Sequence, residues 1–167
     1  TPHQDPMKQA WEYVQYYEFE KAIPLFRAVR SEGEVGSAKW IEATFGLAMS
    51  LQHRTPPDAD SVREARGLYL DLADRCPKAA CVPRAILNAA RIDELRDYYQ
   101  DVIDLKSARA LYRRVIQDYP TDPIVSEAVL RLAQSYIITM KPEEIQEGIK
   151  IIRDWLDSKK IPCEYLD

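Results

Sequence analysis

The sequence is short of the residues that sheets and membrane spans need. Only five of its 167 residues are glycine, and Val, Ile and Thr never form the alternating runs of a half-buried strand. No apolar run approaches the roughly 20 residues that cross a bilayer. Apolar residues instead recur at intervals of three and four along almost the whole chain, which is the period of an amphipathic helix. The sequence therefore predicts an all-α fold without a transmembrane segment.

Clusters of basic residues are also missing. The chain carries 23 Lys and Arg against 27 Asp and Glu, and its net charge is −4. A protein that binds nucleic acid gathers Lys and Arg on one surface, because they must neutralise phosphates. We therefore expect no nucleic-acid partner.

The motifs of catalysis and metal binding are missing as well. The two histidines, His3 and His53, have no cysteine or carboxylate at a useful spacing, and no H-x-x-x-H, G-x-S-x-G or phosphate-binding glycine loop is present. The acidic pairs Asp93-Glu94 and Glu143-Glu144 are interpreted as helix starts and solvated faces. Acid–base catalysis needs converging ionisable groups, and no such set can be named. We expect no enzyme activity, no metal and no cofactor.

Cysteine is scarce, and the three cysteines are Cys76, Cys81 and Cys163. The segment "CPKAAC" lies between two predicted helix pairs, where a turn can bring Cys76 and Cys81 within the roughly 4.4–6.8 Å between Cα atoms that a disulfide requires. The two are candidates for a disulfide if the protein is exported, and they stay as thiols if it is cytosolic. Zinc sites use a C-x-x-C spacing or additional histidines, so no metal is expected here.

What the sequence does contain is a repeat. Ala22, Ala65 and Ala108 are 43 residues apart, and Gly148 follows 40 residues later. Large residues follow each of them after four and after seven residues: Phe26 and Val29, Tyr69 and Leu72, Tyr112 and Val115, Ile152 and Trp155. These positions share one face of a helix, so each unit buries a small residue beside large ones. The small residue lets two helices approach to the roughly 8–10 Å of close packing.

Another helix with its own small residue precedes each of these. The four segments are "KQAWEYVQYY", "WIEATFGLAMSLQ", "AILNAARIDEL" and "AVLRLAQSYII", and their small residues are Ala10, Gly46, Ala89 and Ala133. The sequence thus predicts four helix pairs in a single domain, at residues 5–36, 37–80, 81–121 and 122–157, followed by a tail at 158–167.

Boundary signals accompany these helices. Asp5-Pro6 and Asp122-Pro123 each predict an N-cap followed by a proline in the first turn. The segment "SVRE" from Ser61 to Glu64 has the form of a capping box. The segment "RTPPDAD" before it cannot continue a helix and is predicted to be a loop.

Two places leave alternatives open. Pro24 falls inside a predicted helix, which must bend or start late to accommodate it. Residues 85–119 contain no glycine or proline, so one long helix competes there with a turn near "YYQDVID". The register of the repeat favours the turn, because the third pair then matches the second at both of its helices.

Helix pairs with this pattern resemble tetratricopeptide repeats. The likeness is carried by Ala22 with Phe26, Ala65 with Tyr69 and Pro77, and Ala108 with Tyr112 and Pro120. The segment "YYEFEKAIPLF" is also similar to the family's turn, with Phe19 at the aromatic position, although Tyr17 stands where glycine is expected. The resemblance extends from about Asp5 to Leu156, with units of 40 to 43 residues against the family's usual length of about 34.

The resemblance implies a right-handed α-solenoid of about four helix pairs, whose first helices line a concave groove that binds a protein or peptide. By position, the residues expected to line this groove are Trp11, Gln15, Trp40, Thr44, Leu47, Ile86, Arg91, Arg131 and Gln134. The alternatives are that the tryptophans pack in the core and that the arginines are solvated. One subclass binds C-terminal carboxylates through Lys, Asn and Arg, and the corresponding positions here hold Met7, Trp11, Thr44, Pro83 and Leu87, so that ligand is not expected.

The expected function is a non-catalytic interaction scaffold, and the alternative is a regulatory or small-ligand-sensing domain of a larger protein. The segment "ALYRRVIQDYPTDPIVSEAVLRLAQSYI" resembles the variant found in bacterial envelope proteins such as outer-membrane assembly lipoproteins. A periplasmic or envelope location is therefore expected, with the cytoplasm as the alternative. Because Trp155 and Leu156 end the last helix, we also expect this end to meet further repeats or a second copy in a homodimer.

Overall fold

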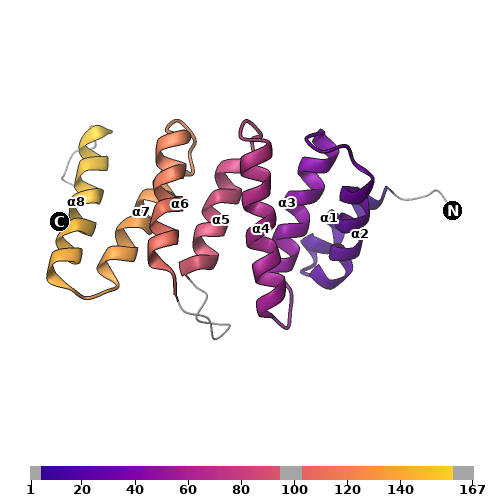
Figure 1. The fold of residues 1–167 in the computed structure, drawn as a ribbon, viewed down its shortest axis with the longest axis horizontal. Coiled ribbons are helices and arrows are strands. Elements are labelled where there is room, and N and C mark those ends of the chain that lie inside the picture. The colour runs from indigo at the N-terminus through magenta and orange to yellow at the C-terminus, as the bar shows by residue number, and fades with distance from the viewer. Residues whose placement is uncertain (1–4, 95–102, 160–167) are drawn as a thin grey trace.

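The computed structural model describes residues 5–94 and 103–159, and all regular structure in those residues is helical. The helices are α1 (Pro6–Gln15), α2 (Phe19–Glu32), α3 (Ala38–His53), α4 (Ala59–Arg75), α5 (Val82–Glu94), α6 (Leu105–Asp118), α7 (Val125–Ile137) and α8 (Pro142–Ser158). Each helix packs against the next one along the chain, and Figure 1 shows them in an elongated row with α1 and α2 at one end and α8 at the other. The prediction of an all-α fold is confirmed. None of the described helices is both long and apolar enough to cross a membrane.

Side-chain bonds also tie helices to the second helix along the chain. Ion pairs join the even-numbered helices in order: Arg27 to Glu64 at 2.7 Å, Arg114 to Asp74 at 3.1 Å and Arg109 to Glu144 at 2.7 Å. Among the odd-numbered helices, the Trp11 indole donates to Glu42 and Arg84 pairs with Glu127, both at 2.8 Å. Alternate helices therefore lie side by side, and we call α1, α3, α5 and α7 the first-helix layer and α2, α4, α6 and α8 the second-helix layer.

The small residues of the repeat lie where helices approach most closely. Ala22, Ala65 and Ala108 are fully buried, as are the aromatic residues four positions after them. A Cβ atom on Gly46 of α3 would lie 2.5 Å from two ring atoms of Phe26 on α2. A Cβ atom on Gly148 of α8 would lie 2.8 Å from the carbonyl oxygen of Ala133 on α7. The predicted pattern of small residues at helix crossings is confirmed.

The last helix departs from that pattern. Ile152 and Trp155 were expected to be buried like their counterparts in the earlier units, but both are only half-buried. The reason is that α8 ends the described row and packs against α7 with no later helix to cover its other side.

One of the three predicted caps is placed as expected and two are not. Asp5 caps α1 by accepting from the Met7 amide at 3.0 Å. The predicted cap at Asp122-Pro123 is wrong, because α7 begins at Val125 with Ile124 as its N-cap, and Asp122 accepts from the Ile124 amide in the turn before the helix. The capping box at Ser61 is wrong, because α4 begins at Ala59 and its N-cap is Asp58, which accepts from the Ser61 amide at 2.7 Å. The predicted loop therefore ends two residues earlier than "RTPPDAD" suggests.

Both open alternatives are settled by the helix bounds. Helix α2 starts at Phe19 and continues through Pro24, so it does not start late. Helices α5 and α6 pack side by side, and the Asp104 amide donates to the Asp93 carbonyl at 3.1 Å, so the chain reverses direction between them. A single helix over 85–119 is excluded, and most of the predicted turn lies at residues 95–102, outside the described residues.

Asp93 corrects another expectation. It was interpreted as part of a solvated face, but its side chain is only 1% exposed. Its carboxylate accepts from Arg66 at 2.6 and 2.9 Å and from the Ser107 hydroxyl at 2.6 Å. Because Arg66 belongs to α4, Asp93 to α5 and Ser107 to α6, this network joins three successive helices. The helical period of the sequence predicts that Asp93 lies on a helix, but it does not predict that Arg66 faces it.

Candidate functional site

The structure places four of the nine predicted groove residues in the core. Trp40, Thr44, Leu47 and Ile86 are at most 3% exposed. They belong to α3 and α5, which have neighbouring helices on both sides, and a buried side chain presents no surface to a partner. The prediction is corrected for these four, and for Trp40 the alternative of core packing is the one observed.

The other five keep some exposed surface, and all lie on the first-helix layer. Gln15 and Gln134 are exposed, whereas Trp11, Arg91 and Arg131 are half-buried. The Trp11 ring packs edge-on against Phe26, with 5.0 Å between ring centroids, and its indole nitrogen donates to Glu42. Trp11 thus helps to hold α1, α2 and α3 together and offers a partner only part of its ring.

The charges of Arg91 and Arg131 both act on the hydroxyl of Tyr112. Tyr112 is on α6, which packs against both α5 and α7, and its hydroxyl donates to Glu94 at 2.7 Å. Burial raises the pKa of Tyr112 far above its usual value and the bond to Glu94 adds to this, whereas the charges of Arg91 and Arg131 oppose it. Two guanidinium groups 40 residues apart in the sequence are therefore within electrostatic reach of one hydroxyl.

Further polar groups of α3, α4 and α5 bond to one another. The Tyr69 hydroxyl donates to Gln52 at 2.9 Å and accepts from the Asn88 amide at 3.2 Å. Desolvation lowers the pKa of His53, and the charge of Arg91 lowers it further, which favours the neutral imidazole. The sequence patterns identified Tyr69 and Tyr112 only as large residues, because periodicity does not show where a hydroxyl points.

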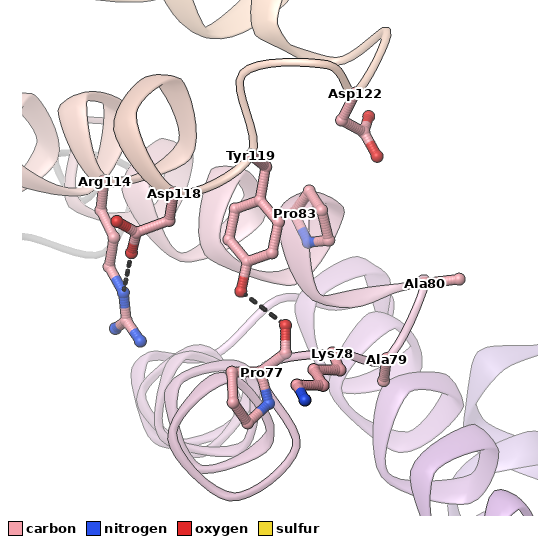
Figure 2. Close-up of a pocket in the computed structure, with 9 residues that line it drawn as sticks. All are labelled: Pro77, Lys78, Ala79, Ala80, Pro83, Arg114, Asp118, Tyr119 and Asp122. Atoms are coloured by element: carbon pink, nitrogen blue, oxygen red, sulfur yellow. Dashed lines mark hydrogen bonds and ion pairs between the residues drawn. The ribbon is translucent and has the colours of Figure 1, made fainter.

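A separate hollow of about 580 Å³ lies between the α4–α5 turn and the α6–α7 turn. Figure 2 shows Tyr119 in this hollow with its hydroxyl turned to the Pro77 carbonyl, to which it donates at 2.8 Å. Arg114 there pairs with Asp118 at 3.6 Å and with Asp74 outside the hollow. The remaining lining residues are Lys78, Ala79, Ala80, Pro83 and Asp122. The sequence analysis did not identify this place.

A second hollow of about 470 Å³ lies one unit earlier, between the α2–α3 turn and the same α4–α5 turn. It is lined by Gly36, Ile41, Arg75, Cys76, Pro77, Lys78 and Ala79. Since the two hollows occupy equivalent places in successive units, we interpret them as gaps between neighbouring turns of the repeat.

Cys76 and Cys81 are free thiols and half-buried, so the candidate disulfide is not formed in this structure. Burial raises the pKa of the Cys81 thiol, and the nearby Cys76 adds to the shift. Cys163 lies outside the described residues. Within the described residues no group of three or more His, Cys, Asp and Glu side chains is placed to hold a metal ion.

In comparisons with known proteins, no family model matches this sequence and no curated protein matches it. The tetratricopeptide resemblance therefore depends on the residues quoted above. What this chain does has to be argued from its own geometry.

Proposed function

We propose that this protein is a non-catalytic scaffold of the tetratricopeptide type, a right-handed solenoid of helix pairs that binds a protein or peptide along its first-helix layer. The observation that carries this proposal is the set of bonds between equivalent helices of successive units, such as Arg27 to Glu64 and Arg84 to Glu127. Stacked pairs joined in this way form two continuous faces. A face of this kind suits an extended or helical segment of a partner.

The rigidity of the layers favours binding. Fully buried residues from α1 to α7 make up the core, so the surface that they support needs little ordering when a partner arrives. Less ordering on association leaves more of the interaction free energy for affinity. The exposed residues of the first-helix layer, including Gln15 and Gln134 at its two ends, then supply the contacts.

A matched pair of variants tests which layer binds. Gln15→Arg with Gln134→Arg adds two bulky charges to exposed positions of the first-helix layer. Gln117→Arg with Gln146→Arg makes the same change at exposed positions of the second-helix layer. The measurement is the set of proteins that the immobilised chain retains from a lysate of its source cells, identified by mass spectrometry.

The proposal is supported if the unmodified protein retains specific partners, the first pair of changes abolishes that retention and the second pair leaves it intact. Equal loss with both pairs, or no specific retention by the unmodified protein, rules against it. Circular dichroism melting of all three proteins establishes that the fold survives, because all four positions are exposed and the substitutions should leave stability nearly unchanged.

A small-ligand-sensing domain is the second candidate, and the hollow at Tyr119 is the observation that favours it. Its volume of about 580 Å³ is within the roughly 300–1,000 Å³ of known ligand sites. A metabolite that raises the melting temperature of the unmodified protein, but not that of an Ala80→Trp variant with the hollow filled, would establish this function. A metabolite screen without any such shift would exclude it.

We also propose that the protein is located in the periplasm or cell envelope. The support for this location is the segment from Ala110 to Ile137, which resembles bacterial envelope proteins. Fractionation of source cells into periplasm, membranes and cytoplasm, followed by immunoblotting, tests it. Recovery of the protein in the cytoplasm would favour the alternative.

A further inference from the structure

The protein neutralises most of its partly buried arginines internally. Within residues 5–94 and 103–159, seven arginines are partly buried: Arg30, Arg54, Arg66, Arg91, Arg109, Arg114 and Arg131. Five of them have a carboxylate oxygen within 3.6 Å. Arg91 and Arg131 have no such partner among the described residues.

A charge that is half-removed from water and left unpaired is unfavourable, which is why buried charges in proteins are usually paired. Arg91 is also incompletely hydrogen-bonded, since its Nε atom is buried and has no partner in the described part of the chain. The two arginines therefore have binding capacity that the protein's own described groups do not use.

Their placement puts both arginines on one stripe of the first-helix layer. The ion pair between Arg84 and Glu127 shows which faces of α5 and α7 meet. Arg91 is two helical turns after Arg84, and Arg131 is one turn after Glu127, so each lies on the same face as a member of that pair.

The local charge is positive. In the part of the chain that the structure describes, the carboxylate bonded to Tyr112 is that of Glu94, and the charges of Arg91 and Arg131 act on the same hydroxyl. Because the imidazole of His53 is favoured in its neutral form, it adds no further charge. Counted over the described residues alone, two arginines against one glutamate leave one net positive charge here, in a chain whose total is −4.

We propose that Arg91 and Arg131 together bind acidic side chains in a peptide segment of the partner protein. The inference rests on the proposed function and names the chemistry of its partner. The two guanidinium groups project from different helices, whose axes lie at least roughly 8–10 Å apart, so a segment with two or more carboxylates can engage both.

Selection from a random library of displayed peptides, each about 12 residues long, tests the inference with the full chain as bait. We expect Asp and Glu to be enriched among the peptides retained by the unmodified protein. That enrichment should be lost with the double variant Arg91→Gln and Arg131→Gln. Arg153→Gln is the control, because Arg153 is an exposed arginine of α8; the change removes one positive charge, where the double variant removes two.

The affinity of one selected acidic peptide, measured by fluorescence anisotropy, should fall about tenfold or more in the double variant and stay within about twofold in the control. Selected peptides without acidic enrichment, or equal enrichment with the double variant, overturn this inference and leave the proposed function standing. Failure to select any peptide overturns this inference, whereas the proposed function is decided by the lysate experiment above. Phenylglyoxal modifies arginine side chains, so it reports whether an anion covers Arg91 and Arg131. If inorganic phosphate protects both arginines and no acidic peptides are selected, the assignment of a peptide ligand is overturned.

Discussion

At the scale of single residues, the absence of a side chain decides how closely two helices pack. Gly46 faces the buried ring of Phe26, and Gly148 faces the Ala133 carbonyl. Gly67 of α4 is different, because an added Cβ atom there would meet nothing within 4 Å. Only some of the glycines in helices are thus required by packing.

Gly46→Ala is expected to destabilise the protein by about 1–3 kcal/mol, because the new methyl group overpacks the core against the Phe26 ring. Gly67→Ala is expected to stabilise it by about 0.5–1 kcal/mol, since alanine is the better residue in an exposed helix. Urea unfolding of both variants measures the two changes. A neutral result for Gly46→Ala would contradict the close approach of α3 to α2.

Tyr17 shows the effect of a backbone angle. Tyr17 occupies the turn position where tetratricopeptide repeats usually have glycine. Its φ is +60°, which lies in the left-handed region. Residues with a side chain disfavour this region by roughly 1–2 kcal/mol. Tyr17 is 83% exposed, so its removal costs little packing.

Tyr17→Gly is therefore expected to raise the free energy of unfolding by about 0.5–1 kcal/mol. The neighbouring Tyr16, at φ −95°, provides the control, and Tyr16→Gly should lower the free energy of unfolding by a similar amount. Chemical denaturation of both variants measures the difference. Destabilisation by Tyr17→Gly would show that its ring contact with Phe19 matters more than its backbone angle.

At the scale of helices, repeating positions were predictable and individual polar contacts were not. The period of the small residues identified the helices and their buried faces, because Ala65 and Ala108 follow the same spacing. It misplaced Trp40, since helical spacing does not tell a groove from a core that is covered on both sides. Asp93 was misinterpreted for a related reason: its partner Arg66 is 27 residues away, and no local pattern reports such a contact.

The Asp93 network joins α4, α5 and α6, so its loss should loosen three helices at once. Asp93→Asn is expected to cost about 3 kcal/mol, because Arg66 is left partly buried without its charge partner. Asp74→Asn removes a carboxylate that is 67% exposed and should cost less than about 1 kcal/mol. Thermal unfolding of both variants measures the contrast, and equal effects would contradict the importance of burial.

At the scale of the whole molecule, contacts run mainly between helices that follow one another in the sequence. The stability of such an array is approximately a sum of terms for the units and their interfaces, so it need not be uniform along the row. Among the helices that the structure describes, those in the middle have a neighbour on both sides, whereas α8 packs against α7 alone.

In native-state hydrogen exchange, the amides of α4 and α5 should therefore exchange most slowly. Among the even-numbered helices, the amides of α8 should exchange fastest. The reason is that α8, at the end of the described row, can open locally while the helices in the middle stay folded. Exchange of all helices with one common free energy would instead indicate a single cooperative unit. Mass spectrometry of peptic fragments resolves the two outcomes.

Local packing also bears on how such a chain can change in length. Duplication or deletion of one complete pair, about 40 to 43 residues in this sequence, leaves every surviving interface with a surface of the kind it had before. Loss of a single helix would instead set two faces of the same layer against each other. Natural variants of this chain that differ in size are expected to differ by entire pairs.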